Sequence, residues 1–541
     1  MGLSGEEVTG DLRAAPCKSF AQPFLLVFVA LLVALEARRW LLLRRRARSS
    51  RGPPGPFPWP ILGNALQLGS APHLAMCRMA RRYGDVFMMK LGGRPVLVLN
   101  GATAIRQALV KQGADFAGRP AFPSFSVVSD GHSMAFGGYS PLWKMHKRVA
   151  QSTLRHFSSS GNAEARADLE RYVVSEAGAL LDIMLERSGG GRYFNPSRLF
   201  ILAIANVMSA LCFGRRYDYD NSEFREIVSR NDKFGRTVGA GSLVDVMPWL
   251  LYFPNPVRTV YRDFVALNME FNAFTRRKVE QHRADFKAGS VPRDFTDSLI
   301  AAVEVERPRS DSGEALLSGQ HVSGAVNDIF GASQDTLSTA LLWLLMFLVR
   351  FPSVQRRVQE EVDRVAGRHR LPRLDDRASL PYTEAFVFET LRYSSFVPVT
   401  IPHSTTTDTE IAGYRVPKDT VVFVNQWSSN HDPERWRDPE TFEPTRFLDE
   451  SGTRVDKDLA SNVLIFSVGK RRCIGDEMSK MQLLLFAAIL AHQCSFEADP
   501  AQTLTMDSSY GLTLKPMPFE VCARVRDHVL AECFADARRQ S

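Results

Sequence analysis

Residues 321 to 350 form a segment in which apolar side chains occur on every face of a helix. Its second half is almost wholly apolar, from Leu341 to Leu348. A helix that is apolar all round either crosses a membrane or lies at the centre of a large core. Its first half carries Asp328, Asp335 and several hydroxyl and amide side chains, which argue against contact with lipid. The sequence therefore predicts a central core helix whose polar residues have a function.

The rest of the chain can supply such a core. Its 541 residues are 45% apolar and 23% charged, which excludes wholesale disorder, collagen and a multi-span membrane protein. Seven cysteines include no C-x-x-C pair, so we expect neither a disulfide framework nor a zinc ribbon, and the compartment is expected to be reducing. The pattern predicts a mainly helical domain with a minor β portion, over residues 61–541. Helices are expected at about 75–83, 102–112, 141–156, 163–186, 198–212, 222–236, 258–288, 320–350, 353–366, 381–393 and 476–491, and strands at 86–91, 95–100 and within 397–425.

Positive charge is concentrated at the N-terminus. Residues 1–51 hold nine basic and four acidic side chains, a net charge of +5. The remaining residues hold 58 basic and 55 acidic side chains, so they carry only +3 of the total charge of +8. This nearly neutral body argues against nucleic-acid binding. An apolar run from Phe20 to Leu35 resumes at Trp40, with acids before it and arginines after it. We expect residues 1–51 to be an uncleaved membrane anchor with the body in the cytosol, and a cleaved signal peptide, which needs the reverse charge order, is the alternative.

Proline dominates the next segment, residues 52–60. Proline fixes φ and removes backbone donors, so this segment is expected to be a stiff extended hinge that sets how the body meets the membrane. A simple linker is equally compatible with its composition.

The most informative stretch surrounds one cysteine, between Phe466 and Gly475. Gly469 and Gly475 allow positive φ and close backbone approach on either side of this cysteine. Backbone N–H groups, the next helix N-terminus and three flanking basic residues are expected to lower the pKa of the Cys473 thiol. A thiolate at this position would be a nucleophile or a metal ligand. The alternative is that Cys473 is a protonated thiol without a chemical role, one of seven cysteines that serve as small buried residues. A nucleophile needs a positioned histidine, and none is close in sequence.

The spacing of these residues resembles the haem-binding loop F-x-x-G-x-R-x-C-x-G of the cytochrome P-450 superfamily, with a match at every specified position. The resemblance covers nearly all of residues 52–520 and looks most like family one, subfamily B, with a sister subfamily left open. It implies the cytochrome P-450 fold and a haem b whose iron is bound by Cys473, with Phe466 packed beside it. A thiolate ligand favours cleavage of the O–O bond.

The resemblance also assigns residues around the haem. Asp335 and Thr336 match the acid and hydroxyl of the motif A-G-x-D/E-T, which relay protons, although Ser333 stands where glycine is usual. A threonine that bonds to its own helix is the alternative interpretation. Glu389 is expected to hold Arg392 and Arg446 in a buried charge network that supports folding. The expected partners of the haem propionates are Trp143, Lys147 in place of an arginine, Arg471 and His403.

A flat apolar substrate cavity is implied by the same comparison. Its expected substrates are polycyclic aromatic hydrocarbons and oestrogens, with retinoids and fatty acids next, each hydroxylated or epoxidised. The expected lining residues are Phe136, Asn231, Phe234, Phe271, Ala332, Gln334, Val397, Ile401 and Leu512.

Electrons have to come from a partner, because the chain shows no G-x-G-x-x-G or G-K-[ST] motif. The family implies NADPH-cytochrome reductase, sometimes helped by a microsomal b-type cytochrome, docked on basic residues near the cysteine. We expect an enzyme of the endoplasmic reticulum membrane, with a mitochondrial pool left open. Two alternatives remain: a haem-thiolate isomerase or dehydratase that needs no external electrons, and a non-enzymatic haem-binding module. The basic residues are Lys144, Lys147, Arg148, Arg155, Lys470 and Arg472.

Overall fold

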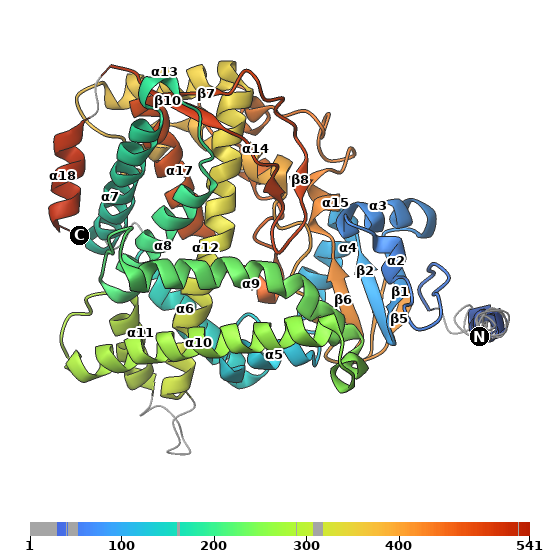
Figure 1. The fold of residues 1–541 in the computed structure, drawn as a ribbon. Coiled ribbons are helices and arrows are strands. Elements are labelled where there is room, and N and C mark those ends of the chain that lie inside the picture. The colour runs from blue at the N-terminus through green and yellow to red at the C-terminus, as the bar shows by residue number, and fades with distance from the viewer. Residues whose placement is uncertain are drawn as a thin grey trace, which may run out of the picture.

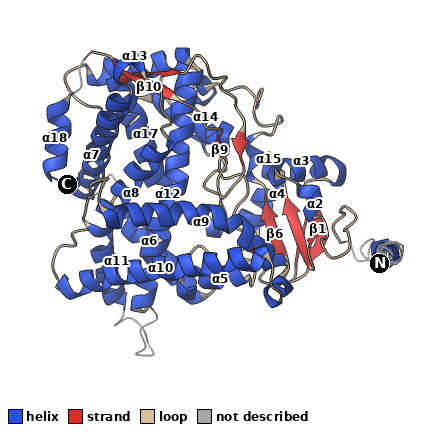
Figure 2. Cartoon of the chain, viewed as in Figure 1, coloured by secondary structure: helices blue, strands red, loops and turns tan. Residues whose placement is uncertain are grey.

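The computed structural model describes residues 27, 30–38, 40–41, 52–158, 163–287, 289–306, 317–527 and 530–540. Helices make up most of it, and the strands are confined to one small sheet and three short pairs, as Figure 2 shows. The expected mainly helical architecture with a minor β portion is confirmed. Most of the anchor expected at residues 1–51 lies outside the described residues. The part that is described, residues 27, 30–38 and 40–41, is helical.

The main sheet lies on one side of the molecule, next to the N-terminal segment (Figure 1). Its strand order is β1-β2-β6-β3, in which β1 and β2 form the expected hairpin and β6 joins β2 in parallel. The hairpin turn consists of Gly92 and Gly93 alone, one residue shorter than expected, because Arg94 already pairs with Leu91. The strands are β1 Val86–Leu91, β2 Arg94–Leu99, β3 His403–Ser404, β4 Thr409–Ile411, β5 Tyr414–Val416, β6 Val421–Val424, β7 Cys494–Ala498, β8 Ser508–Ser509, β9 Lys515–Pro516 and β10 Val521–Val525.

Helices fill the rest of the molecule. The α-helices are α2 Ala65–Leu68, α3 Pro72–Tyr83, α4 Gly101–Arg106, α5 Pro123–Val127, α6 Pro141–His156, α7 Ala163–Arg187, α8 Ser197–Phe213, α9 Ser222–Val246, α10 Pro256–Asp285, α11 Phe295–Glu306, α12 Gly319–Arg350, α13 Pro352–Ala366, α14 Pro381–Ser394, α15 Gln426–Asn430, α16 Lys457–Ala460, α17 Asp476–Gln493 and α18 Ala531–Gln540. Shorter 3-10 and π segments include η1 Gln107–Lys111, η2 Val128–Gly131, η4 Pro248–Tyr252, η7 Pro444–Phe447 and η8 Gly469–Arg471.

Helix α12 runs through the middle of the molecule (Figure 1). It packs against α8, α10, α14 and α17, and every side chain from Leu337 to Val349 is buried. Among the described helices it alone is long and apolar enough to cross a membrane, but 78% of its most apolar window is buried inside the protein. This confirms the expected core helix.

Sequence periodicity underestimated some helices. Helix α9 continues ten residues beyond the expected end at 236, through a glycine-rich stretch, because it packs along α10 and this contact outweighs the low helix propensity of glycine. Helices α11 and α18 were not expected. Helix α18 docks on α7, where the Phe534 ring fills the space beside Gly178 so closely that a Cβ there would lie 2.6 Å from it.

Candidate active site

Cys473 lies in a tight loop between η8 and α17. The N–H of Cys473 donates to the carbonyl of Phe466 at 2.9 Å, which closes the loop. Ser467 and Gly469 adopt the left-handed conformation, with φ of 58° and 76°. Gly475 does not use the positive φ that glycine allows: its φ is −89°, and a Cβ at that position would meet the Cys473 Sγ at an ordinary 3.9 Å.

Gly469 holds this loop against the N-terminal third of the chain. A Cβ at Gly469 would lie 1.7 Å from the carbonyl oxygen of Leu109, an impossible contact with backbone. We expect Gly469→Ala to lower the free energy of unfolding by at least about 3 kcal/mol, as measured by urea denaturation. Gly413→Ala is the control, because Gly413 has a similar φ of 79° with nothing within 4 Å of an added Cβ. It should cost about 1 kcal/mol, and equal losses for both variants would contradict the steric argument.

A cavity of about 730 Å³ opens in front of the cysteine. Two acids line it, but Asp476 is paired with Arg472 and Lys480, and Glu477 with Arg377. The six basic residues that the sequence places near the cysteine line the same cavity, so they lie on one face: Lys144, Lys147, Arg148, Arg155, Lys470 and Arg472.

The Cys473 thiol does not have the lowered pKa expected from the sequence. Its side chain is exposed where it lines the cavity, yet it lies deep among protein atoms, and the resulting desolvation raises its pKa. A backbone hydrogen bond from Gly475 and the charges of Lys147 and Arg472 oppose this rise without overcoming it. The neighbouring charges that lower the pKa can be seen in the sequence, whereas the burial that raises it cannot. A bound metal deprotonates a thiol outright, so the raised pKa is compatible with a ligand role.

Beside the cysteine loop, Arg471 and His403 are hydrogen-bonded to backbone carbonyls rather than to acidic side chains. Arg471 lies 3.9 Å above the Trp143 ring, and its three guanidinium nitrogens donate to backbone carbonyls of residues 117, 134 and 137. Burial lowers the pKa of Arg471 to about 9. His403 is buried on β3 and bonds to the carbonyl of Phe116, and burial, followed by the charge of Arg119, keeps its pKa well below the usual value.

Arg119 belongs to this group, although no sequence motif identifies it. Its guanidinium donates to the carbonyls of Ala135, Ile401 and Pro402. Burial, together with the nearby charge of Arg471, holds its pKa well below the ordinary value. In the described part of the chain neither arginine makes an ion pair with an acid. Half-buried guanidinium groups that lack an acidic partner, close to a thiol, fit a ligand that carries both a metal and carboxylates, as haem does.

Trp143 and Lys147, expected at the propionates, are committed to other groups. The Trp143 indole donates to the carbonyl of Met134 at 2.8 Å. The Lys147 ammonium donates to the carbonyls of Lys470 and Arg472, both at 2.8 Å, and so braces the cysteine loop from α6. Phe466 is half-buried, with its ring packed against the main core and Lys480 5.3 Å above it.

The middle of α12 carries the expected relay residues. The Thr336 hydroxyl donates to the carbonyl of Ala332 at 2.8 Å, which is the local bond that an isolated threonine often makes. Ser333 bonds in the same way to Phe330, which turns its hydroxyl toward the helix backbone. The Asp335 carboxylate accepts from Thr513 and pairs with Lys515, two residues that no motif had indicated.

Most of the expected substrate residues lie on segments that surround the middle of α12. Phe136 follows η2, Phe234 is on α9 and Phe271 is on α10. Each of these three elements packs against α12. The Phe271 ring stacks on Phe330 with centroids 6.1 Å apart. Ala332 and Leu512 are exposed, and Val397 and Ile401 are half-buried in the segment before β3.

Two of the expected polar substrate contacts are not visible. Gln334 is fully buried, and neither atom of its amide has a hydrogen-bond partner among the described residues. The side chain of Asn231 lies outside the described residues. Contact of either residue with substrate stays a prediction.

The charge network behind the loop is assembled in full. The Arg392 guanidinium grips Glu389 through two bonds of 2.7 and 2.9 Å, and both side chains are fully buried. Arg446, on η7, adds a bond of 3.1 Å to the same carboxylate. The network therefore ties α14 to the segment that leads toward the cysteine loop.

Three histidines meet where η2, α6 and α12 converge. The His146 and His321 rings lie 5.1 Å apart, and those of His132 and His321 4.9 Å apart. His146 Nε2 bonds to the carbonyl of His321 at 2.8 Å. Burial, followed by the charge of His321, lowers the pKa of His146 to about 4.

This depressed pKa predicts sensitivity to acid. An unfolded histidine binds a proton near pH 6.5 but folded His146 does so only near pH 4, so its contribution to stability is complete above pH 6.5 and is lost as the pH falls toward 4. The loss is about 1.4 kcal/mol per pH unit. In urea titrations from pH 7 to 5, His146→Asn should flatten the slope of unfolding free energy against pH by one proton. A wild-type slope in His146→Asn would contradict this assignment.

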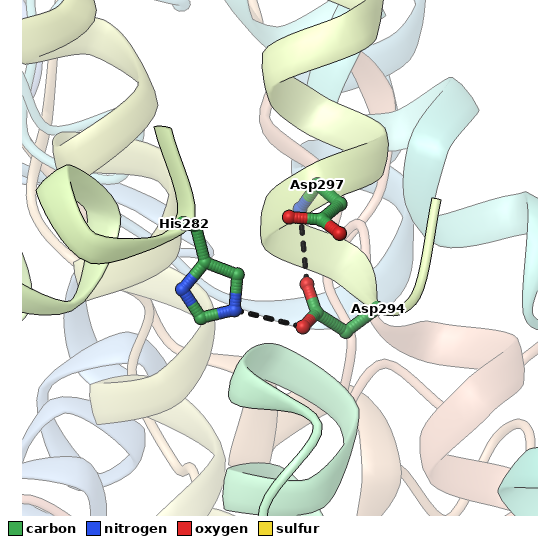
Figure 3. A group of neighbouring side chains, drawn as sticks. All are labelled: His282, Asp294 and Asp297. Carbon is green, nitrogen blue, oxygen red and sulfur yellow. Dashed lines mark hydrogen bonds and ion pairs between the residues drawn. The ribbon is translucent and has the colours of Figure 1, made fainter. Parts of the chain in front are cut away.

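A second cluster of titratable groups lies between α10 and α11 (Figure 3). Potential ligand atoms of His282, Asp294 and Asp297 lie within 4.8 Å of one another. Each is already used: His282 Nε2 bonds to Asp294 at 2.8 Å, Asp294 accepts the N–H of Asp297 at 2.9 Å, and Arg293 pairs with Asp297. The arrangement caps α11 and joins it to α10 through these hydrogen bonds.

Comparison with known proteins agrees with this geometry. The model of the family described as "Cytochrome P450" matches residues 53–523. The chain is 54% identical to human cytochrome P450 1B1 over 511 residues, and 53% identical to the mouse protein of the same name over 512 residues, with 94% of both proteins covered in each case. It is 46% identical to rabbit cytochrome P450 1A1 over 465 residues, 85% of this chain and 89% of that protein.

These matches span the cysteine loop, the acid and hydroxyl of α12 and the Glu389 network. The superfamily indicated by the loop motif is confirmed, and so is the likeness to subfamily B. The chain belongs to the cytochrome P450 family.

Proposed function

We propose that this cytochrome P450 monooxygenase hydroxylates or epoxidises planar aromatic and steroid-like molecules. Polycyclic aromatic hydrocarbons and oestrogens are the first candidates, and retinoids and fatty acids come next. Support comes from the aromatic residues around α12, where Phe136, Phe234 and Phe271 offer flat apolar surface. The exposed Ala332 on α12 leaves room beside them.

Haem b is the cofactor that the site fits best. Cys473 would bind its iron, and Arg119, Arg471 and His403 would face its carboxylates. The bound haem would supply oxygen activation. The observation that carries the proposal is that Arg119 and Arg471, which have no acidic partner among the described residues, lie with His403 near the one cysteine that lines the cavity.

The residues of α12 would handle the protons. The overall reaction consumes one substrate, one O₂, two electrons and two protons, and yields one oxygenated product and one water. Thr336 lies on the exposed face of α12 with Ala332, where its hydroxyl oxygen can accept a hydrogen bond while its proton is held by the Ala332 carbonyl. Asp335, on the neighbouring face, is the acid that can exchange a proton with water.

The basic face around the cavity is the proposed site for an acidic electron donor, NADPH-cytochrome reductase, with a microsomal b-type cytochrome as an additional donor. Six basic residues there face two acids that are already paired, which favours a negatively charged partner. Docking on this face would bring the donor to the cysteine side of the haem.

A lipid surface is the proposed partner of the N-terminal region, at the endoplasmic reticulum membrane. Leu31 and Leu35 in the N-terminal helical segment are each 56% exposed, and Ile61 and Leu66 are 62% and 71% exposed. Glu36 of the same segment pairs with Lys90 on β1 at 2.9 Å, which fixes the segment against the body. This arrangement would set the height of the body above the membrane.

The test uses the full-length protein in lipid vesicles with the reductase. NADPH-dependent oxygen uptake should rise when a planar polycyclic aromatic is added and should yield an oxygenated product. A haem-thiolate isomerase would instead rearrange a peroxide substrate without NADPH. A protein that stays colourless after reconstitution with haem would contradict the proposal. The product profile on oestradiol would then define regiochemistry.

A further inference from the structure

The Asp335 carboxylate is held by the segment that leads into β9. Lys515 Nζ lies 2.7 Å from Asp335 Oδ1, and the Thr513 hydroxyl donates to Oδ2, also at 2.7 Å. The Thr513 proton is thereby committed to Asp335, so Thr339, 3.1 Å away, donates to the Thr513 oxygen. Both carboxylate oxygens are therefore engaged by residues that are about 180 positions away in the sequence.

This holding segment is firmly fixed to the core. The carbonyl of Leu514 accepts from the Trp343 indole on α12 at 2.8 Å, and its N–H donates to the carbonyl of Phe396, also at 2.8 Å. Thr513 is 2% exposed, whereas the Lys515 side chain is 37% exposed. The segment thus joins a buried hydroxyl to a cation in contact with solvent.

The acid and the hydroxyl of the relay face different partners. Thr336 bonds to Ala332 one turn earlier on α12, while Asp335 points to Thr513 and Lys515. Asp328, two turns before Asp335, is itself engaged by Ser133 and by the N–H groups of residues 134 and 135. Among the described charged residues, Lys515 is the ion-pair partner of Asp335.

We propose that Lys515 and Thr513 are positioning residues for proton delivery. They hold the Asp335 carboxylate on the solvent side of α12 between proton transfers, and Lys515 keeps it next to water. A proton reaches a carboxylate oxygen through that water, which regains a proton from bulk solvent; the proton then leaves toward the Thr336 side, and the ionised carboxylate returns to Lys515. The inference rests on the monooxygenase function and adds to it the side from which protons enter.

The test compares Lys515→Met with Lys515→Arg in the reconstituted holoenzyme. Electrons from NADPH end in oxygenated product, in hydrogen peroxide or in water, and the three are measured together. Since a general acid contributes about 10² to 10⁴ in rate, losing its positioning residue should lower product per NADPH by about three- to tenfold, with the balance appearing as peroxide. The solvent deuterium isotope effect on product formation should increase. Lys515→Arg should restore the wild-type ratio, and KM for the aromatic substrate should not change.

Lys418→Met, at an exposed lysine in the turn before β6, is the matched control and should behave like the wild type. Wild-type partitioning in Lys515→Met would overturn the proposal, and so would failure of Lys515→Arg to restore it.

A second measurement does not depend on activity. In a thermal-unfolding cycle with Asp335→Asn, the double variant should lose no more stability than the larger single variant, because both substitutions remove the same pair. Additive losses would overturn the proposed pair. If the wild-type enzyme formed no product, the monooxygenase function would fail, and this cycle would still decide whether Lys515 positions Asp335.

Discussion

Replacing Glu389 with glutamine is expected to lower the free energy of unfolding by about 3 to 5 kcal/mol. The substitution keeps the shape of the side chain but removes the charge that faces Arg392, which is fully buried, and Arg446, which is 11% exposed. Both guanidinium groups would then lack an anionic partner and keep only neutral acceptors, chiefly backbone carbonyls. A neutral amide also cannot accept three charged donors and the N–H of Glu443. Urea denaturation of the full-length protein measures the effect.

Glu497→Gln is the matched control. Glu497 pairs with Arg524 across β7 and β10 at 3.0 Å, but both side chains are about half exposed. Exposed ion pairs contribute about 0 to 1 kcal/mol, so this variant should unfold almost as the wild type does. If Glu389→Gln cost no more than Glu497→Gln, the network would not carry the stability that its burial indicates.

Cys473→Ala is expected to abolish product formation. The thiol that lines the cavity is the proposed iron ligand, so its removal should also eliminate the strongly red-shifted Soret band of the reduced carbon monoxide complex. Cys533→Ala, on α18 and outside the site, should keep both the band and the activity. A thiolate-type band retained in Cys473→Ala would remove this cysteine from the mechanism.

Helix positions were predictable wherever apolar periodicity and length agreed, as in α6, α8 and α12. Periodicity did not indicate α18, because this helix is held by the packing of the Phe534 ring against Gly178 on α7. Propensity gave the wrong end for α9, because packing along α10 carries the helix across its glycines. The sequence thus indicated elements that are stable in themselves and missed those that are stabilised by a distant partner.

The site divides in the same way. A spaced motif located Cys473, because iron ligation constrains neighbouring residues within ten positions. Arg119 and Lys515 were missed because each acts through groups far away in the sequence, and neither has a local pattern of its own. The direction of the Cys473 pKa was wrong because nearby charges are visible in a sequence and desolvation is not.

The contacts that close the cysteine loop join segments that are more than 330 positions apart in the sequence. Gly469 presses on Leu109, and Arg471 bonds to carbonyls 334 to 354 positions earlier. During synthesis on the ribosome, the segment around residues 109–137 emerges long before its partner is made. The pocket is therefore complete only after residues 469–473 have been synthesised, and the cofactor has to be inserted after that point.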